Sequence, residues 1–219
     1  RCELTAAPRV ATLSGEVRNA SSTEFVANAS VIAKDVRGRS ATVTTDADGR
    51  FRFENVPAGK VHVEASADGY LTSATDLELE ARVPMSSQIL LNKRPAQASV
   101  VVTKGELKLK RQVHFLFDSS DILPDSASIL EEIADVLRAH PELGPIEIQG
   151  HTDDVGSPEH NLRLSDDRAG AVRGALLRLG IDASRLSSRG YGKEKPLVPN
   201  VSPQNRAKNR RVQLMIQNP

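Results

Sequence analysis

The hydrophobic pattern of the chain changes its period near residue 94, and this change sets the expected architecture. Before it, short runs of alternating apolar and polar residues are separated by Gly, Pro, Asp and Asn, which is typical of an all-β sandwich. After it, strand-like runs alternate with longer segments whose apolar residues recur every three or four positions, which is typical of a two-layer α/β domain. Residues 94–98 contain a proline and no apolar stripe, so we expect a domain boundary there.

This pattern divides the 219 residues into four parts: a tail (1–10), a seven-stranded sandwich (11–94), a linker (95–105) and an α/β domain (106–219). The strands predicted in the sandwich are 12–18, 29–34, 40–45, 50–54, 61–66, 76–80 and 87–91. The α/β domain is predicted to have the order βαβαβ-β: strand 106–117, a helix capped by Asp125 or Ser126 and stopped by Pro141, strand 146–149, helix 158–179, strand 186–190 and strand 211–216.

Turn chemistry separates the third and fourth strands of the sandwich. Gly49 ends the sequence DADG and supplies the positive φ of a tight turn, so we expect a hairpin whose Phe51 and Phe53 face the sheet interior. A calcium loop is disfavoured because a closing bidentate Glu is missing. The stretch TTDADGRFRFENVPAGKVHVEASADGY (44–70) resembles the carboxypeptidase regulatory-like family. The resemblance extends over about residues 11–93 and implies a prealbumin-like sandwich.

Composition excludes several classes of function. Lys and Arg (29) balance Asp and Glu (28) in both halves of the chain, and only 3% of residues are aromatic, so nucleic acid is not an expected partner. Cys2 is the only cysteine, which excludes an intramolecular disulfide and a cysteine-based metal cluster. His151 and His160 lack the spacing of a zinc motif, and Ser165 lacks a nucleophile elbow. We therefore expect no metal, no cofactor and no enzymatic activity.

The segment GHTDDVGSPEHNLRLSDDRA (150–169) concentrates polar residues between a predicted strand end and a helix start. Such a place holds side chains on a rigid scaffold while leaving them open to solvent. Asp153 follows the strand, and Arg168 lies about three turns into the helix. Gly156 makes it easy for the intervening loop to fold back, so the two charged residues are candidates to meet.

This segment, continued to residue 181 and flanked by FLFDSSDI, SSRGYG and NRRVQL, resembles the OmpA-like C-terminal domain over about residues 106–217. The resemblance implies a module at the periplasmic face of the outer membrane of a Gram-negative bacterium. It also implies noncovalent binding of peptidoglycan through the diaminopimelate residue of the stem peptide. Asp153 and Arg168 are then the ligand-binding residues, and the supporting positions are Phe117, Asp118, Thr152, Asn161 and Leu164.

The chemistry of this ligand suits the pair. Diaminopimelate, amidated into the stem through one end, leaves a free ammonium beside a free carboxylate. Asp153 would accept hydrogen bonds from the ammonium, and the forked guanidinium of Arg168 would grip the carboxylate. A lysine-type stem lacks that carboxylate and would leave Arg168 unpaired.

Structural roles compete with these assignments. Asp153 and Arg168 can form a structural ion pair in a module that assembles with another envelope protein. Asn161 can be a helix cap and Phe117 a core residue. Arg210 and Arg211 flank the last strand, where alternation sends one of them away from the core, either towards glycan or phosphate or, as we expect, into solvent as a surface arginine.

The N-terminal part offers two further hypotheses. Cys2 is a candidate site of lipid attachment to the outer membrane, although Arg1 precedes it where lipoprotein processing would cut. The sandwich has no identifiable site in its sequence, and either a spacer role or docking through an edge strand would suit it.

Overall fold

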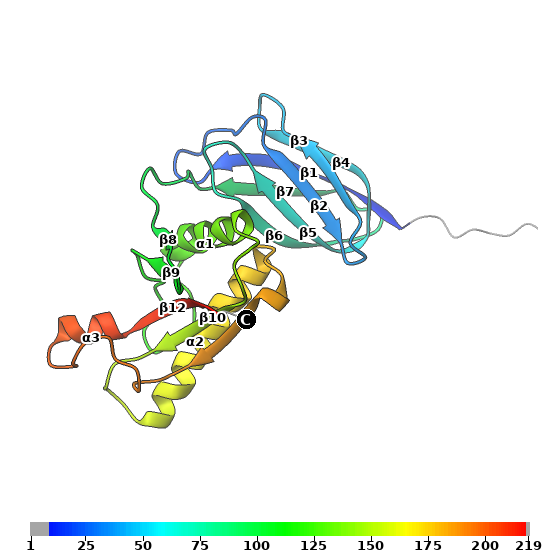
Figure 1. Cartoon of the computed structure of the whole chain (residues 1–219). Helices are drawn as coiled ribbons and strands as arrows, with labels where there is room; N and C mark the ends of the chain where they lie inside the picture. Colours follow the sequence, from blue (N-terminus) through cyan, green and yellow to red (C-terminus); the bar gives the residue numbers. More distant parts are fainter. Residues whose placement is uncertain (1–8, 218–219) are drawn as a thin grey trace, which may run out of the picture. The chain divides into compact units, whose positions relative to one another are not determined.

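The computed structural model describes residues 9–217, which form two compact units, one ending at Arg94 and the other beginning at Pro95 (Figure 1). Each unit has its own buried apolar residues. Cys2 lies outside the described residues. Within residues 9–217, no helix combines the length and the apolar character needed to cross a membrane.

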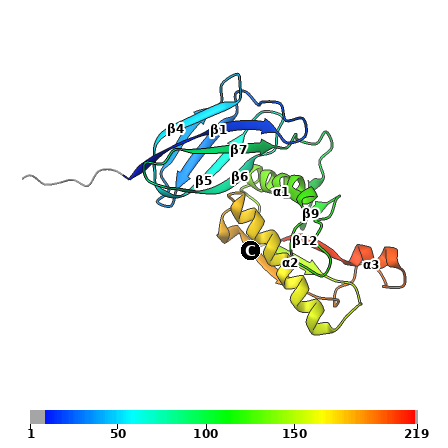
Figure 2. The same ribbon diagram turned by 180° about the vertical axis from the view of Figure 1, so that it is seen from behind.

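The first unit is a seven-stranded β-sandwich, which confirms the prediction. Its strands are β1 (Val10–Asn19), β2 (Ser30–Asp35), β3 (Ser40–Thr44), β4 (Arg50–Pro57), β5 (Gly59–Ser66), β6 (Ser73–Leu79) and β7 (Met85–Leu91). One sheet has the order β4-β1-β7 and the other β3-β2-β5-β6, and Figure 2 shows β4, β1 and β7 side by side. Alternate residues of both sheets, among them Leu13, Val31, Phe53, Val63 and Leu91, are buried between them.

The turn between β3 and β4 joins the two sheets, so the predicted hairpin is wrong. β3 pairs with β2, whereas β4 pairs with β1. The turn chemistry itself is as expected: Gly49 has a φ of 68°, and the Asp46 carboxylate accepts a hydrogen bond from Arg50 N (2.8 Å). Phe51 and Phe53 are both buried. Turn residues fix the local reversal, but the pairing partner is decided by which sheet buries each strand's apolar face.

The second unit is a two-layer α/β fold, as predicted. Its sheet has the order β11-β10-β12-β9-β8 and consists of β8 (Val100–Val102), β9 (Glu106–Leu109), β10 (Ile146–His151), β11 (Leu186–Gly190) and β12 (Arg211–Ile216). Helices α1 (Ala127–Ala139) and α2 (Pro158–Arg178) pack on the face that carries Ile146, Ile148 and Leu214. A short helix, α3 (Pro203–Asn209), precedes β12 (Figure 1).

Some local predictions for this unit are wrong. Only residues 106–109 of the predicted strand 106–117 join the sheet. The rest leaves it, and His114 N donates a hydrogen bond to Ser126 Oγ (2.8 Å). The Ser126 side chain makes no capping hydrogen bond to α1, because the backbone of Ser126 is itself helical, with φ −89° and ψ −4°. β8 and α3 are absent from the sequence prediction, and β8 lies in the segment expected to be a linker.

Two glycines allow α2 to lie directly on β10 and β11. A Cβ atom on Gly150 would meet the backbone oxygen of Ser165. One on Gly190 would lie 2.5 Å from the backbone nitrogen of Asp166. Gly190 N also donates a hydrogen bond to Asp166 Oδ1, and Gly192 N donates one to Ser165 Oγ, each at 2.9 Å. The first turns of α2 are therefore held against the carboxyl ends of both strands.

Substitution of Gly150 by alanine is expected to destabilise the second unit by about 1–3 kcal/mol, because the added methyl group forces α2 away from the sheet. Denaturant unfolding measures this change. Gly170→Ala is the matched control, since an added Cβ at this position of α2 has nothing within 4 Å. It should raise stability by up to about 1 kcal/mol, and equal effects of the two substitutions would contradict the packing argument.

Candidate functional site

The polar loop predicted to carry the site joins β10 to α2. Ser157 caps α2, and its hydroxyl accepts a hydrogen bond from His160 N (3.1 Å). The expectation that Asn161 is the cap is therefore wrong. Asn161 is buried, and its Nδ2 donates to Val155 O (2.9 Å), which ties the loop back onto the helix. Gly156 has a φ of 96° at the fold of this loop.

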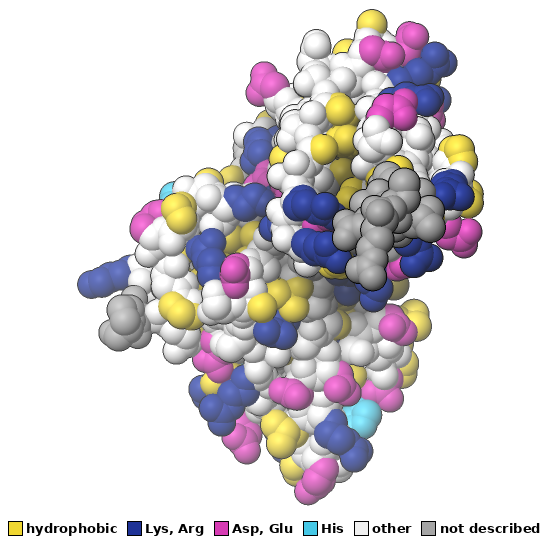
Figure 3. All heavy atoms as spheres, turned by 90° about the vertical axis from the view of Figure 1, so that its right-hand side faces the viewer, with side chains coloured by type: hydrophobic (Ala, Val, Ile, Leu, Met, Phe, Trp, Pro, Cys, Tyr) yellow, Lys and Arg dark blue, Asp and Glu magenta, His cyan; other side chains and the backbone are white. Residues whose placement is uncertain are grey.

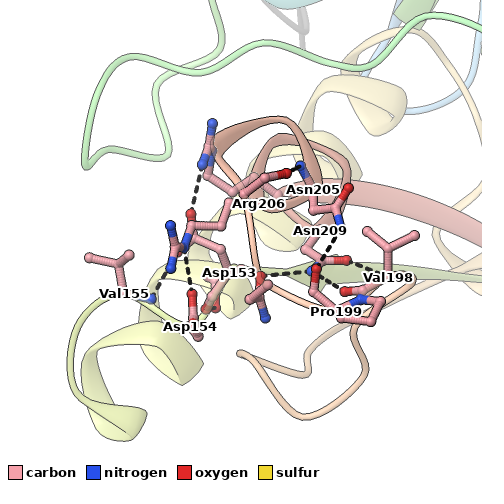
Figure 4. Close-up of polar contacts among 12 residues, drawn as sticks. Asp153, Asp154, Val155, Val198, Pro199, Asn205, Arg206 and Asn209 are labelled. Carbon is pink, nitrogen blue, oxygen red and sulfur yellow. Dashed lines mark hydrogen bonds and ion pairs between the residues drawn. The ribbon is translucent and has the colours of Figure 1, made fainter.

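Asp153 is buried at the exit of β10, and both of its carboxylate oxygens accept hydrogen bonds. Its exposed fraction is 7%. Oδ1 accepts from Val155 N at 3.0 Å, shown in Figure 4, and Oδ2 accepts from Arg210 Nη1 at 2.6 Å. A buried carboxylate is stable only with such partners. The anion is thus held in one orientation.

Arg168 is half-buried on α2 and makes no ion pair with Asp153. Within residues 9–217, the only hydrogen bond of its side chain runs from Nε to Ser119 O (2.9 Å). Its guanidinium carbon lies 5.0 Å from the centroid of the Phe115 ring, which is a cation–π distance. Both terminal nitrogens of Arg168 are therefore without a partner in the described part of the chain.

Neighbouring charges act on Arg168 as well as burial. Burial lowers the pKa of Arg168 most; Arg210 lowers it further, and Asp118 and Asp153 raise it. The structure thus brings Asp153 and Arg168 within electrostatic reach of each other. The ion pair of Asp153, however, forms with Arg210.

The residues predicted to support the site lie in different environments. Phe117 is 95% exposed, so the core role considered for it is wrong. Asp118 has a φ of 50°, and its Oδ1 lies 2.8 Å from His160 Nε2. Thr152 is buried and donates its hydroxyl to Asp153 O (3.0 Å). Leu164 is half-buried on α2 and contributes no polar group.

Helix α3 adds positive charge that the sequence prediction missed. Arg206 Nε donates to Asp154 Oδ1 at 2.9 Å (Figure 4). The amide of Asn209, buried at the end of the helix, holds the preceding segment, since Nδ2 donates to Val198 O at 2.8 Å. This bond fixes the position from which Arg210 reaches Asp153.

Of the two arginines that flank β12, Arg210 is at the surface and Arg211 is not. The side chain of Arg210 is 48% exposed, although it pairs with Asp153. Arg211 is only 7% exposed, and it donates to Lys195 O (3.1 Å) and Asn209 O (3.2 Å). Strand alternation places Arg211 on the sheet face away from the helices, but loop carbonyls cover it there.

Comparison with known proteins identifies both units. Residues 114–210 match the model of the OmpA family, and residues 12–92 match that of the carboxypeptidase regulatory-like domain. Outer membrane protein A from Bordetella avium is 33% identical over 149 residues, which cover 68% of this chain and 73% of that protein. The chain belongs to the OmpA family.

Other OmpA-type proteins are similar over the second unit. The peptidoglycan-associated lipoprotein of Haemophilus influenzae is 40% identical over 102 residues, covering 47% of this chain and 66% of that protein. The crystal structure of the peptidoglycan-associated lipoprotein from Burkholderia pseudomallei aligns with a TM-score of 0.45 and 38% identity, over 50% of this chain and 92% of that one. Of several further curated relatives, the chain spans 13% to 50% of the length.

A buried histidine lies immediately before the OmpA-type loop. His151 is 2% exposed and stacks on Tyr191, with 5.5 Å between ring centroids. Within residues 9–217, neither of its ring nitrogens has a hydrogen-bond partner. Burial lowers the pKa of His151 to about 4, and Arg211 and Lys195 contribute to the fall. The imidazole is therefore neutral at pH 7.

Acid should destabilise this OmpA-type unit through His151. An unfolded histidine titrates near pH 6.5, so between about pH 6.5 and pH 4 the unfolded state binds a proton that the folded state does not. The free energy of unfolding should fall across this window by about 3 kcal/mol, at about 1.4 kcal/mol per pKa unit.

The substitution His151→Phe keeps the stacking on Tyr191 and removes the titrating group. Unfolding of both proteins by denaturant, measured from pH 7 to pH 4, gives the difference in stability at each pH. We expect the advantage of the variant to grow as the pH falls. A difference that stays constant over this range would show that His151 does not titrate on unfolding.

Proposed function

We propose that this chain binds peptidoglycan noncovalently through its second unit and that the diaminopimelate residue of the stem peptide is the group recognised. The observation that carries the proposal is the half-buried guanidinium of Arg168, whose terminal nitrogens have no partner within residues 9–217. A partly desolvated cation left with free donors favours a ligand carboxylate. A carboxylate could bind there without first breaking an ion pair.

The second half of the ligand head is accommodated by the neighbouring anion. The Asp153 carboxylate is oriented by Val155 N and Arg210, each of which uses one lone pair on a different oxygen. Each oxygen retains acceptor capacity for the ligand ammonium. In this proposal the ammonium of diaminopimelate pairs with Asp153, and the adjacent carboxylate pairs with Arg168.

The comparisons support the coarser part of this proposal. One relative is named a peptidoglycan-associated lipoprotein, and another, of which the chain covers 73%, is named outer membrane protein A. We therefore place this chain in the periplasm or at the periplasmic face of the outer membrane, where it links an envelope component to the cell wall. We propose binding without catalysis.

Arg168→Met should lower the affinity for a diaminopimelate-type stem peptide about 10- to 100-fold. It removes the charge-assisted hydrogen bonds to the ligand carboxylate, a net loss of about 1.4–2.7 kcal/mol after desolvation, while keeping an unbranched side chain against Phe115. Calorimetry measures the affinity, and thermal unfolding reports stability, which should change little. Arg163→Met is the control, because Arg163 is exposed on the same helix. Equal affinities of the two variants would refute the role of Arg168.

The same chain should discriminate between stem peptides. A lysine-type peptide, which lacks the side-chain carboxylate, should bind at least about tenfold more weakly, because Arg168 then remains desolvated and unpaired. Asp153→Asn keeps the acceptor for Val155 N while removing the charge that attracts the ammonium, and it should weaken both peptides alike. Equal affinity of the unaltered protein for the two peptides would exclude recognition through the carboxylate.

These variants also decide the alternative, in which the charged residues only hold the fold of an assembly module. If the protein is only an assembly module, the Arg168 variant should have a lowered melting temperature and should still sediment with insoluble peptidoglycan. The binding function predicts the reverse.

A further inference from the structure

The first unit contains a polar cleft to which no role has yet been given. Its volume is about 580 Å³, which falls within the range of about 300–1,000 Å³ typical of small-molecule sites. It is lined by residues of β1, β4 and β7, of the end of β3 and of the turn that follows β3, among them Ser14, Glu16, Thr44, Arg52, Ser86 and Gln88.

Strand alternation explains why these side chains are available. In β1 and β7, Leu13, Val17 and Ile89 point into the core, so Ser14, Glu16 and Gln88 project from the opposite face of the sheet. The register places Ser14 beside both Arg52 and Ser86, and Glu16 beside both Arg50 and Gln88. Short serine side chains lie between longer ones, which leaves the space of the cleft.

The cleft offers hydrogen bonds of both kinds. Within the described residues, the hydroxyls of Thr44 and Ser86 take part in no intramolecular hydrogen bond, and that of Ser14 makes only a long one of 3.5 Å to Met85 O. A hydroxyl both donates and accepts. The hydroxyl groups of a ligand could therefore either donate hydrogen bonds to these side chains or accept hydrogen bonds from them.

Three of the four charged side chains of the cleft are paired with an opposite charge, and the fourth, Asp46, accepts hydrogen bonds from the backbone N–H groups of Asp48 and Arg50. Glu16 accepts hydrogen bonds from Arg18 (2.7 Å) and Gln88 (2.9 Å). Arg52 pairs with Glu54, and Arg50 lies 3.9 Å from Asp48. Elsewhere on the surface both signs of charge also occur, and Figure 3 shows acidic and basic side chains on the same face of the molecule. An anionic ligand would have to break one of the pairs in the cleft, whereas an uncharged polar ligand would not.

We propose that this cleft binds an uncharged oligosaccharide. Free hydroxyls, a side-chain amide and charged groups that already have partners match a ligand whose surface consists of hydroxyl groups and apolar ring faces. The cleft uses neither Asp153 nor Arg168, so this inference is independent of the function proposed for the second unit.

The test uses the full chain carrying Arg168→Met, so that stem-peptide recognition is disabled, and two peptide-free probes, the tetramers of N-acetylglucosamine and of glucose in β-1,4 linkage. NMR titration should give saturable shifts in the first unit with at least one probe. Ser86→Leu fills the cleft from an exposed position on the edge strand β7 and should weaken that binding at least tenfold. Ser40→Leu is the matched control on the exposed edge strand β3 and should leave it unchanged.

The absence of saturable shifts with both probes would overturn the proposal, and so would equal binding by the two leucine variants. The effect of Arg168→Met on stem-peptide binding tests only the function proposed for the second unit. The oligosaccharide titrations test only the cleft of the first unit, so either proposal can fail without the other.

Discussion

The contact of α2 with the sheet at Gly150 and Gly190 is the constraint on which the candidate site depends. Backbone touches backbone there, so no side chain can act as a spacer between helix and strands. Ser165 and Asp166 convert the contact into hydrogen bonds to the glycine-containing strand end. This fixes both the rotation and the height of α2, and a helix fixed in this way carries Asn161 and Arg168 to defined positions above the exit of β10.

The electrostatic organisation of the site follows from that placement. Asp153 is anchored by a cation that comes from beyond α3, whereas Arg168, on α2, is anchored only through Nε. If the two had paired with each other, a ligand would have to compete with a partly buried ion pair, whose disruption is expensive. Because Asp153 pairs with Arg210 instead, the terminal nitrogens of Arg168 keep no hydrogen-bond partner within residues 9–217. The proposed zwitterionic ligand requires this separation of the two roles.

Local sequence signals predicted most of the fold. The strands of the sandwich and both long helices are marked by periodicity and by turn residues such as Gly49 and Gly180, both of which have positive φ. The β3–β4 hairpin was wrong because turn chemistry does not select the pairing strand. Residues 110–117 alternate like a strand but are held by loop contacts instead. The start of α3 does carry a signal, since Ser202 followed by Pro203 is a cap with proline at the first helical position.

The site was harder to predict because its decisive contacts are distant in sequence. Asp153 and Arg168 could be named from spacing and resemblance, and the loop fold-back at Gly156 is local. The partner of Asp153 is 57 residues away, and its reach depends on a buried amide, Asn209, that no periodic pattern reveals. His151 is hidden for a similar reason, because its burial results from Tyr191 and neighbouring loops rather than from its own strand pattern.

A site of this size is expected to bind weakly on its own, and the nature of the proposed ligand compensates for this. A few charge-assisted hydrogen bonds must offset the loss of translational and rotational freedom and the desolvation of two charges. Peptidoglycan, however, presents the same stem peptide many times on one polymer, and a second weak site on the same chain would act at a high effective concentration once the first is occupied. A polar cleft on the sandwich that recognises sugars would contribute in this way without any contact between the two units. The linear connection through residues 94–99 would be enough, because avidity requires only that both sites can be occupied together.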